Sequence, residues 1–415
     1  MTLTLKIQND ESIESIQMNT NHTSKESTMP AEDKRLIREI TLRNILSFGP
    51  DTPPLELAPL NVLIGPNGSG KSNLIDCIDL MRKTPNEKEF EYICQDGGGG
   101  KNWIWNYEIG AILTIEIETY DSILQTSIRH KIGIAPHLET YNFLFEIEHI
   151  RSNIDSDYDS LRDRDAEGKF TLGKAYEIKP SARSILAERW DPIQHPERVY
   201  LADCVYKKIK IYRETSFGRG NILRKSVDVA YPKDQLDEKL VNLPLFLNFL
   251  SRNPSTKNRI LEELNNVLPD VTGFETSAKG THLELYLTEN NKNIPATRLS
   301  DGTLRYLCLL TILCNPEPPP LICIEEPELG LHPDVLPGLA NLLVEASTRT
   351  QLIVTTHSEI LVDALGEIPE SIIVCEKHEG KTQFKRLNSE EVKSFLEDYS
   401  LGKMWIDGDI GGKRW

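Results

Sequence analysis

Long apolar runs are missing from this 415-residue sequence. No stretch approaches the roughly 18 apolar residues that a membrane-spanning helix needs, and the polar N-terminus has no hydrophobic signal region. We therefore expect a protein without membrane segments that stays in the cytoplasm. No heptad pattern persists over several turns, which excludes a long coiled coil, and we find no internal repeat.

Positive charge is also scarce. Lys and Arg total 47 against 63 Asp and Glu, which gives a net charge of −16. This balance excludes bulk coating of nucleic acid or of an anionic membrane surface, although it leaves a local basic groove open. The seven cysteines form no CxxC pair. We interpret them as buried free thiols in a reducing compartment rather than as a disulfide or zinc framework.

The clearest motif follows a short apolar run. Leu60 to Ile64 predicts a buried strand, and apolar residues at helical spacing predict a helix from near Lys71 to Arg82. A GxxxxGK[ST] phosphate loop lies between them. The residues that we predict to bind nucleotide here are Gly65, Pro66, Asn67, Gly68, Ser69, Gly70, Lys71, Ser72 and Asn73.

Each part of this loop has a chemical reason. Glycines allow successive backbone N–H groups to converge on phosphate oxygens without a Cβ in the way. Lys71 would place its charge on the β- and γ-phosphates, and Ser72 would offer its hydroxyl to Mg²⁺. The N-terminus of the following helix adds its positive dipole. The alternative is an ordinary Gly-rich turn.

A second motif is a pair of acids after a buried strand. Leu321 to Ile324 predicts the strand, and Glu325 and Glu326 follow it directly. Carboxylates at the C-terminal end of such a strand suit metal binding and water activation beside bound phosphates. Glu325 would hold the metal and Glu326 would polarise the attacking water. The alternative is two acids that simply end a strand.

Two further segments are ambiguous when taken alone. Ser300 and Gly302 open an apolar helix and could form an anion site, although, taken alone, an ordinary N-cap explains them better. His357 follows the predicted strand Gln351 to Thr355 and could reach a γ-phosphate, although a histidine in this position is usually structural.

The rest of the chain shows mixed patterns. Strands that alternate with helices in the last third predict a parallel sheet with helices on both faces. In the middle region we expect strands at Ala111 to Thr119, Val199 to Tyr212 and His282 to Thr288, and helices at Leu236 to Leu250 and Asn258 to Leu268, with Pro244 and Pro254 as breakers.

In order and spacing, the four motifs resemble Walker A, the signature, Walker B and the switch histidine of ABC-type ATPases. The chain resembles more closely the RecF/SMC-like branch of these P-loop NTPases, with an AAA-type core domain. The segments that carry this resemblance are Ile45 to Gly49, Asn61 to Leu74, Leu299 to Tyr306, Glu325 to Pro333 and Thr355 to Ser358.

The chain is also similar to a bacterial group of uncharacterised predicted ATPases. This likeness rests on Lys101 to Trp105, Ser216 to Arg219 and Gly411 to Trp415.

The resemblance implies ATP and Mg²⁺ as cofactors and a homodimer that sandwiches two ATP molecules. Ser300 and Gly302 would then act in trans, and His357 would sense the γ-phosphate. Catalysis would fall to Glu326, His357 and Lys71. The segment from Glu328 to Pro333 takes the place of the D-loop, and Gln95 and Gln125 are the candidates for a Q-loop glutamine.

The resemblance also implies an architecture. We expect an α/β ABC-type ATPase head with an inserted α+β lid region and no long coiled coil. Residues 1–33 would be a disordered leader, and residues 34–83 the N-terminal lobe with Walker A. Residues 84–298 would supply an antiparallel sheet and the lid, and residues 299–415 the C-terminal lobe with signature, Walker B and switch histidine.

Three classes of function stay open. The first is an ATPase linked to DNA in repair or phage defence. The second is a nucleotide-gated switch that controls an effector protein, such as a nuclease, without binding DNA. The third class is a transporter motor. It is the least favoured, because the insertion between Walker A and the signature is longer than the heads of ABC transporters carry. A basic stretch could line a DNA groove or be the solvated face of a hairpin; it contains Lys207, Lys208, Lys210, Arg213, Arg219, Arg224 and Lys225, with Tyr206, Tyr212 and Phe217 between them.

Overall fold

A computed structural model describes residues 35–107, 110–121, 126–136, 143–152, 163–164, 169–172, 174–177, 183–213, 218–390, 392 and 399–412. The expected leader, Gln125, residues 216–217 and residues 413–415 lie outside the described residues. The three later segments expected from the sequence all belong to one compact unit, Lys34–Trp415. No helix in the described part is long and apolar enough to cross a membrane.

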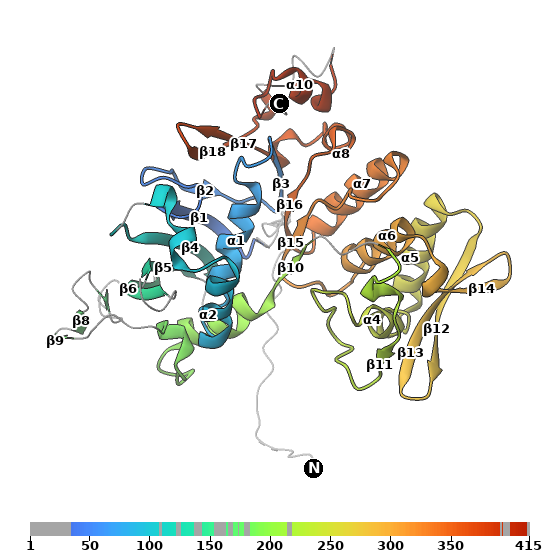
Figure 1. Cartoon of the computed structure of the whole chain (residues 1–415), viewed down its shortest axis with the longest axis horizontal. Helices are drawn as coiled ribbons and strands as arrows, with labels where there is room; N and C mark the ends of the chain where they lie inside the picture. Colours follow the sequence, from blue (N-terminus) through green and yellow to red (C-terminus); the bar gives the residue numbers. More distant parts are fainter. Residues whose placement is uncertain are drawn as a thin grey trace, which may run out of the picture. The chain divides into compact units, whose positions relative to one another are not determined.

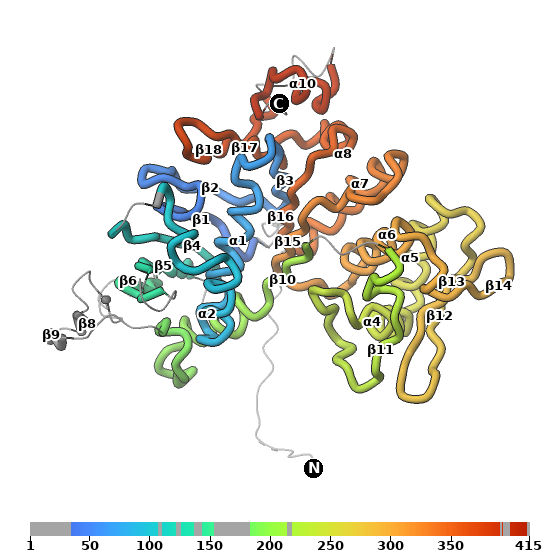
Figure 2. The backbone as a smooth tube through the Cα atoms, in the orientation of Figure 1, coloured from blue at the N-terminus to red at the C-terminus, as the bar shows by residue number. Residues whose placement is uncertain are grey.

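A six-stranded sheet forms the centre of this unit (Figure 1). Its strands, in spatial order, are β10 (Ile209–Tyr212), β15 (Leu321–Glu325), β16 (Gln351–Thr355), β3 (Leu60–Ile64), β17 (Ile372–His378) and β18 (Lys381–Arg386). All neighbours run parallel except β18, which is antiparallel to β17. The predicted parallel α/β sheet is confirmed. Figure 2 shows that β3, from the N-terminal part of the chain, lies among strands from its C-terminal part.

The strands β3, β15 and β16 are buried on both faces, which explains why they read as nearly continuous apolar runs. Leu63 and Cys323 belong to a core with the apolar side of α1 (Lys71–Arg82). Val62 and Ile322, each one residue earlier, belong to a second core. That core contains the buried sides of three helices, α6 (Asp301–Leu313), α7 (Leu336–Ser347) and α8 (Glu359–Asp363).

An antiparallel sheet shares the core of α1. Its order is β2 (Leu55–Glu56), β1 (Ile37–Arg43), β4 (Leu113–Asp121), β5 (Thr126–Pro136) and β6 (Phe143–Ser152). Along β4 every second residue is buried, as a strand with one core face requires. The helix α2 (Glu87–Asp96) adds Phe90 to this core. A small hairpin sheet follows, with β7 (Asp163–Arg164), β8 (Lys169–Leu172) and β9 (Lys174–Glu177).

The expected strand from Val199 to Tyr212 is wrong over most of its length. The chain forms α3 (Pro196–Val199), a π-helical segment (Tyr200–Val205) and a short 3-10 turn (Tyr206–Lys208) before β10. Leu201 and Val205 are both buried, four residues apart on one helical face. The aromatic and β-branched residues favoured a strand by propensity, and burial of a helical face overrode it.

A smaller α+β portion precedes α6. It contains β11 (Val227–Asp228), β12 (Val271–Lys279), β13 (His282–Glu289) and β14 (Lys292–Pro295), with helices α4 (Leu243–Leu250) and α5 (Pro254–Val267). Pro244 and Pro254 lie in the first turns of α4 and α5, so the prediction that they break helices is wrong. Proline is tolerated there because the first N–H groups of a helix have no partner within it.

The last helix of the described residues is α10 (Leu401–Asp407).

All seven cysteines are free thiols; Cys204 is half-buried and the other six are buried.

Candidate functional site

The C-terminal ends of four parallel strands bring the predicted motifs to one edge of the central sheet. The phosphate loop follows β3, the acidic pair ends β15, and His357 follows β16, which lies between them. Arg213 follows β10 on the other side of β15. In a parallel sheet this edge is where ligands bind, beside the N-termini of the following helices.

The phosphate loop needs glycine for its backbone. Gly65, Gly68 and Gly70 have φ angles of 143°, 74° and 103°, in the left-handed range that favours glycine. A Cβ on Gly65 would lie 2.1 Å from the carbonyl oxygen of Cys375, and one on Gly70 would lie 2.2 Å from Oγ1 of Thr382. The loop is therefore packed tightly against β17 and β18 as well as being locally bent.

Lys71 lies over this loop. Its Nζ donates hydrogen bonds to the carbonyl oxygens of Gly65 and Pro66, at 2.8 and 3.0 Å. Burial lowers the pKa of Lys71, while the nearby carboxylates of Glu326 and Glu328 act in the opposite direction. Lys71 is the first residue of α1, and Ser72 beside it is exposed. The charge and the hydroxyl thus sit at the helix N-terminus.

Thr382, which the sequence did not point to, and Ser47, which lies in the segment from Ile45 to Gly49, contact the loop and α1. Thr382 is 1% exposed, and its hydroxyl donates to the carbonyl oxygen of Ser69 at 2.8 Å and lies 2.7 Å from Oγ of Ser47. Ser47 also accepts a hydrogen bond from Nδ2 of Asn73 at 2.7 Å. The amide of Asn73, predicted to bind nucleotide, is thus engaged in holding α1 to Ser47. Nothing local in the sequence distinguishes Thr382.

Glu326 is held by its backbone. Its N–H donates to the carbonyl oxygen of Thr355 at 3.0 Å, and its own carbonyl accepts from Nη2 of Arg305 at 2.7 Å. Its φ of 43° is left-handed, a conformation that a non-glycine residue keeps only when its surroundings impose it. Oε1 of Glu326 lies 3.9 Å from Nε2 of His357. The structure therefore brings these two predicted catalytic residues together.

Glu328 fixes the segment that carries His357. Its Oε1 accepts hydrogen bonds from Oγ1 of Thr356 at 2.8 Å and from the N–H of His357 at 2.7 Å. Burial raises the pKa of Glu328, and these hydrogen bonds oppose the rise. The segment from Glu328 to Pro333, predicted as the D-loop, is thereby tied to His357 within one chain.

The predicted signature residues lie at the start of α6. Oγ of Ser300 accepts from the N–H of Thr303 at 3.0 Å, so Ser300 is the N-cap of the helix. A Cβ on Gly302 would lie 2.7 Å from the carbonyl oxygen of Gly330, so α6 and the D-loop segment approach closely. Arg224 holds the next side chain, Asp301, with its Nη2 2.5 Å from Oδ1.

Glu325 could hold a metal ion together with Ser72. Its Oε1 accepts from Nη1 of Arg213 at 2.6 Å. Burial raises the pKa of Glu325, and the positive charge of Arg213 opposes that rise. Within the described ranges, no group of three or more His, Cys, Asp or Glu side chains is arranged to hold a metal. One carboxylate and one hydroxyl fit Mg²⁺, which takes its remaining ligands from water and nucleotide phosphates.

Other predicted residues lie elsewhere. Gln95 lies near the C-terminal end of α2. The residue that directly follows β10, the strand paired with one side of β15, is Arg213 and not a glutamine. Three members of the basic stretch are in ion pairs: Lys207 with Asp203, Arg213 with Asp76 and Glu325, and Arg224 with Asp301.

Most of the chain matches a known protein family. The family model described as "AAA domain, putative AbiEii toxin, Type IV TA system" matches residues 60–363, well over half of the chain. No curated protein matches.

Two solved structures of SMC heads are similar in fold. One is an SMC head bound to the C-winged helix domain of ScpA, with 14% identity and a TM-score of 0.53 over 86% of this chain and 99% of that one. The other is an Smc head with an extended coiled coil bound to the C-terminal domain of ScpA, derived from Pyrococcus furiosus, with 12% identity and a TM-score of 0.53 over 88% and 99% of the two chains. The chain belongs to the AAA-domain family of that description, and its fold is similar to that of SMC heads.

Proposed function

We propose that this protein binds ATP with Mg²⁺ at the edge of its central sheet and hydrolyses it. The observation that carries this proposal is the assembly of the phosphate loop, the acidic pair and His357 at adjacent strand ends. Gly65 to Asn73 would surround the phosphates, with the ammonium of Lys71 released from the loop carbonyls to meet the β- and γ-oxygens. Ser72 and Glu325 would hold Mg²⁺, which would neutralise charge on these oxygens.

Glu326 is the proposed general base. A carboxylate can take a proton from water only when it is held within reach of it, and the backbone of Glu326 is fixed from both sides by Thr355 and Arg305. His357, whose Nε2 lies 3.9 Å from Oε1 of Glu326, would contact the γ-phosphate and keep that carboxylate in place.

We further propose that two copies close around two ATP molecules. Each chain carries one signature segment, and Ser300 and Gly302 would contact the nucleotide of the partner. The close approach between Gly302 and Gly330 supports this arrangement, because it links the signature to the segment expected at the dimer interface. The similarity in fold to SMC heads supports it as well.

The target of the cycle is proposed to be DNA, in repair or phage defence. The family description, which names a putative toxin of a type IV TA system, favours defence over repair. The alternative is a nucleotide-gated switch for an effector protein. Two observations favour this alternative. Lys207, Arg213 and Arg224 are engaged in ion pairs, and the net charge of the chain is −16. Both reduce the positive charge that a groove would need to bind DNA.

One experiment tests these proposals together. ATP turnover is measured with double-stranded, single-stranded and no DNA, and the mass in solution is followed by light scattering. Glu326→Gln should abolish turnover and accumulate an ATP-bound dimer; normal turnover by this variant would remove Glu326 from the role of base. Stimulation by DNA supports the DNA-linked ATPase, and DNA-indifferent turnover with the same dimerisation supports the switch.

A further inference from the structure

Three carboxylates converge on the guanidinium of Arg213. Nη1 donates to Oε1 of Glu325 at 2.6 Å, and Nη2 donates to Oδ1 of Asp76 at 2.7 Å. Oδ2 of Asp79 lies 3.6 Å from the same Nη2. The side chains of Asp79 and Glu325 are 13% and 16% exposed, whereas those of Asp76 and Arg213 are 33% and 40% exposed, so solvent screens the inner part of the cluster least. The guanidinium of Arg213 thus contacts three carboxylates, one of which, Asp79, is also paired with Arg82.

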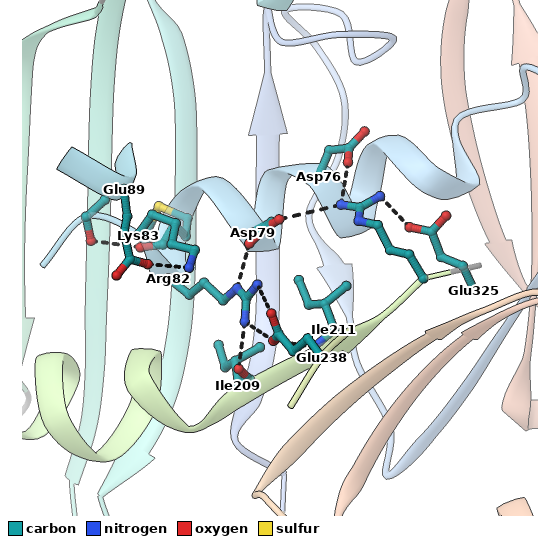
Figure 3. Close-up of polar contacts among 12 residues, drawn as sticks. Asp76, Asp79, Arg82, Lys83, Glu89, Ile209, Ile211, Glu238 and Glu325 are labelled. Carbon is teal, nitrogen blue, oxygen red and sulfur yellow. Dashed lines mark hydrogen bonds and ion pairs between the residues drawn. The ribbon is translucent and has the colours of Figure 1, made fainter. Parts of the chain in front are cut away.

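The location of this cluster connects it to the nucleotide site. Arg213 directly follows β10, which pairs with β15, so it lies at the strand end that carries Glu325. Asp76 lies one helical turn beyond Ser72 on α1 and therefore on the same face of the helix. In Figure 3, dashed lines join Asp76 and Asp79 of α1, and Glu325, to one guanidinium. The guanidinium thus lies between the helix of the phosphate loop and the proposed metal carboxylate.

A second ion-pair group keeps this arrangement in place. Arg82 donates to Oδ1 of Asp79 at 2.6 Å, pairs with Glu238, and donates to the carbonyl oxygen of Ile209 at 2.9 Å (Figure 3). Glu238 in turn accepts from the N–H of Ile211 at 2.9 Å. Asp79 and the strand β10 are therefore fixed to each other, which holds the backbone of Arg213 in position.

We propose that Arg213 is a positioning residue: in the absence of nucleotide, its guanidinium pairs with Glu325, Asp76 and Asp79 and so takes the place of a metal ion beside Glu325. Its guanidinium balances Asp76, Asp79 and Glu325, so the chain without nucleotide gains little by binding a divalent cation there. With ATP, the phosphate oxygens supply the additional negative charge and ligands that let Mg²⁺ approach Glu325. Metal binding is thereby made conditional on nucleotide. This inference rests on the proposed function only in taking Glu325 as the metal carboxylate.

The test measures Mn²⁺ binding to the full chain without nucleotide, by electron paramagnetic resonance of free Mn²⁺. The wild type should bind weakly. Arg213→Ala should bind about tenfold more tightly, because removing one unit charge at short range from a carboxylate cluster has an effect of at least this order. Arg213→Lys, which retains the charge, should behave like the wild type. Adding Asp76→Asn to Arg213→Ala should weaken the new binding again.

The chain offers a matched control in Arg259. Like the side chain of Arg213, that of Arg259 is 40% exposed, and it pairs with two carboxylates, those of Glu263 and Glu345. Arg259→Ala should leave Mn²⁺ affinity unchanged. Circular dichroism melting checks that each variant is folded, and Arg213→Gln replaces Arg213→Ala if the latter is not.

Two results overturn the inference: Mn²⁺ affinity of Arg213→Ala equal to that of the wild type, or an equal gain in Arg259→Ala. Binding of a fluorescent ATP analogue in EDTA is measured separately. Failure of that binding would count against the proposed function, whereas the Mn²⁺ result in nucleotide-free protein would still decide the role of Arg213.

Discussion

The hydroxyl of Thr382 provides the sharpest test of how the phosphate loop is held. Thr382 lies on β18, at the far end of the sequence from the loop, yet its hydroxyl lies 2.8 Å from the carbonyl oxygen of Ser69 and 2.7 Å from Oγ of Ser47. Thr382→Val keeps the shape of the side chain and removes only this group. The variant therefore isolates the contribution of the hydroxyl from that of packing.

The expected loss follows from burial. Thr382 is 1% exposed, so water cannot replace the missing donor. Losing a typical intramolecular hydrogen bond costs about 1 kcal/mol, and leaving a buried acceptor unpaired costs about 1–3 kcal/mol. We expect Thr382→Val to lower the free energy of unfolding by about 2 kcal/mol. ATP binding should weaken as well, because the carbonyl of Ser69 belongs to the loop that we propose surrounds the phosphates.

Denaturant unfolding and titration with a fluorescent ATP analogue measure the two effects. Thr348 is the control, since its exposed hydroxyl donates to the carbonyl oxygen of Glu345 at 2.7 Å. Thr348→Val should change the free energy of unfolding by no more than about 0.5 kcal/mol and leave ATP affinity unchanged. Equal effects of the two substitutions would refute the argument that Thr382 supports the loop.

Two further predictions concern the loop glycines and the D-loop acid. Gly70→Ala should lower stability by at least about 2 kcal/mol, since its φ is 103° and its Cβ would lie 2.2 Å from Oγ1 of Thr382. Gly68→Ala, with a φ of 74° and nothing within 4 Å of its Cβ, should lose only about 1 kcal/mol, and equal losses in thermal melts would contradict this reading. Burial raises the pKa of Glu328 in the folded protein above its ordinary value of 4.5. The contribution of Glu328 to stability therefore falls as the pH rises from 4.5 through this raised pKa. The melting temperature of Glu328→Gln relative to the wild type should therefore increase from pH 4 to pH 8, and a difference independent of pH would show that this carboxyl is not desolvated.

The local parts of the site were predictable from the sequence. The strand, Gly-rich loop and helix around Lys71 are contiguous, and each has its own signal in apolar spacing and glycine content. The meeting of Glu326 and His357 followed from parallel topology, because the C-terminal ends of neighbouring parallel strands share one edge.

The contacts between distant segments were not predictable in the same way. The hydrogen bonds of Thr382 to Ser47 and Ser69, and the pairing of Arg213 with Asp76, depend on how β18 and β10 are placed beside the loop and α1. No residue pattern near Thr382 or Arg213 encodes these partners. The segment before β10 departs from the expected strand for a different reason: its aromatic and β-branched residues favour strands, whereas its burial pattern is helical.

Direct titration with ATP and Mg²⁺ tests the central claim, that the loop from Gly65 to Asn73 is a nucleotide site. Isothermal titration calorimetry compares the wild type with Lys71→Ala, which removes the ammonium that lies over the loop carbonyls. Circular dichroism confirms that both proteins are folded. The account predicts saturable binding by the wild type and loss of that binding in Lys71→Ala. Equal ATP affinity in the two proteins would contradict it.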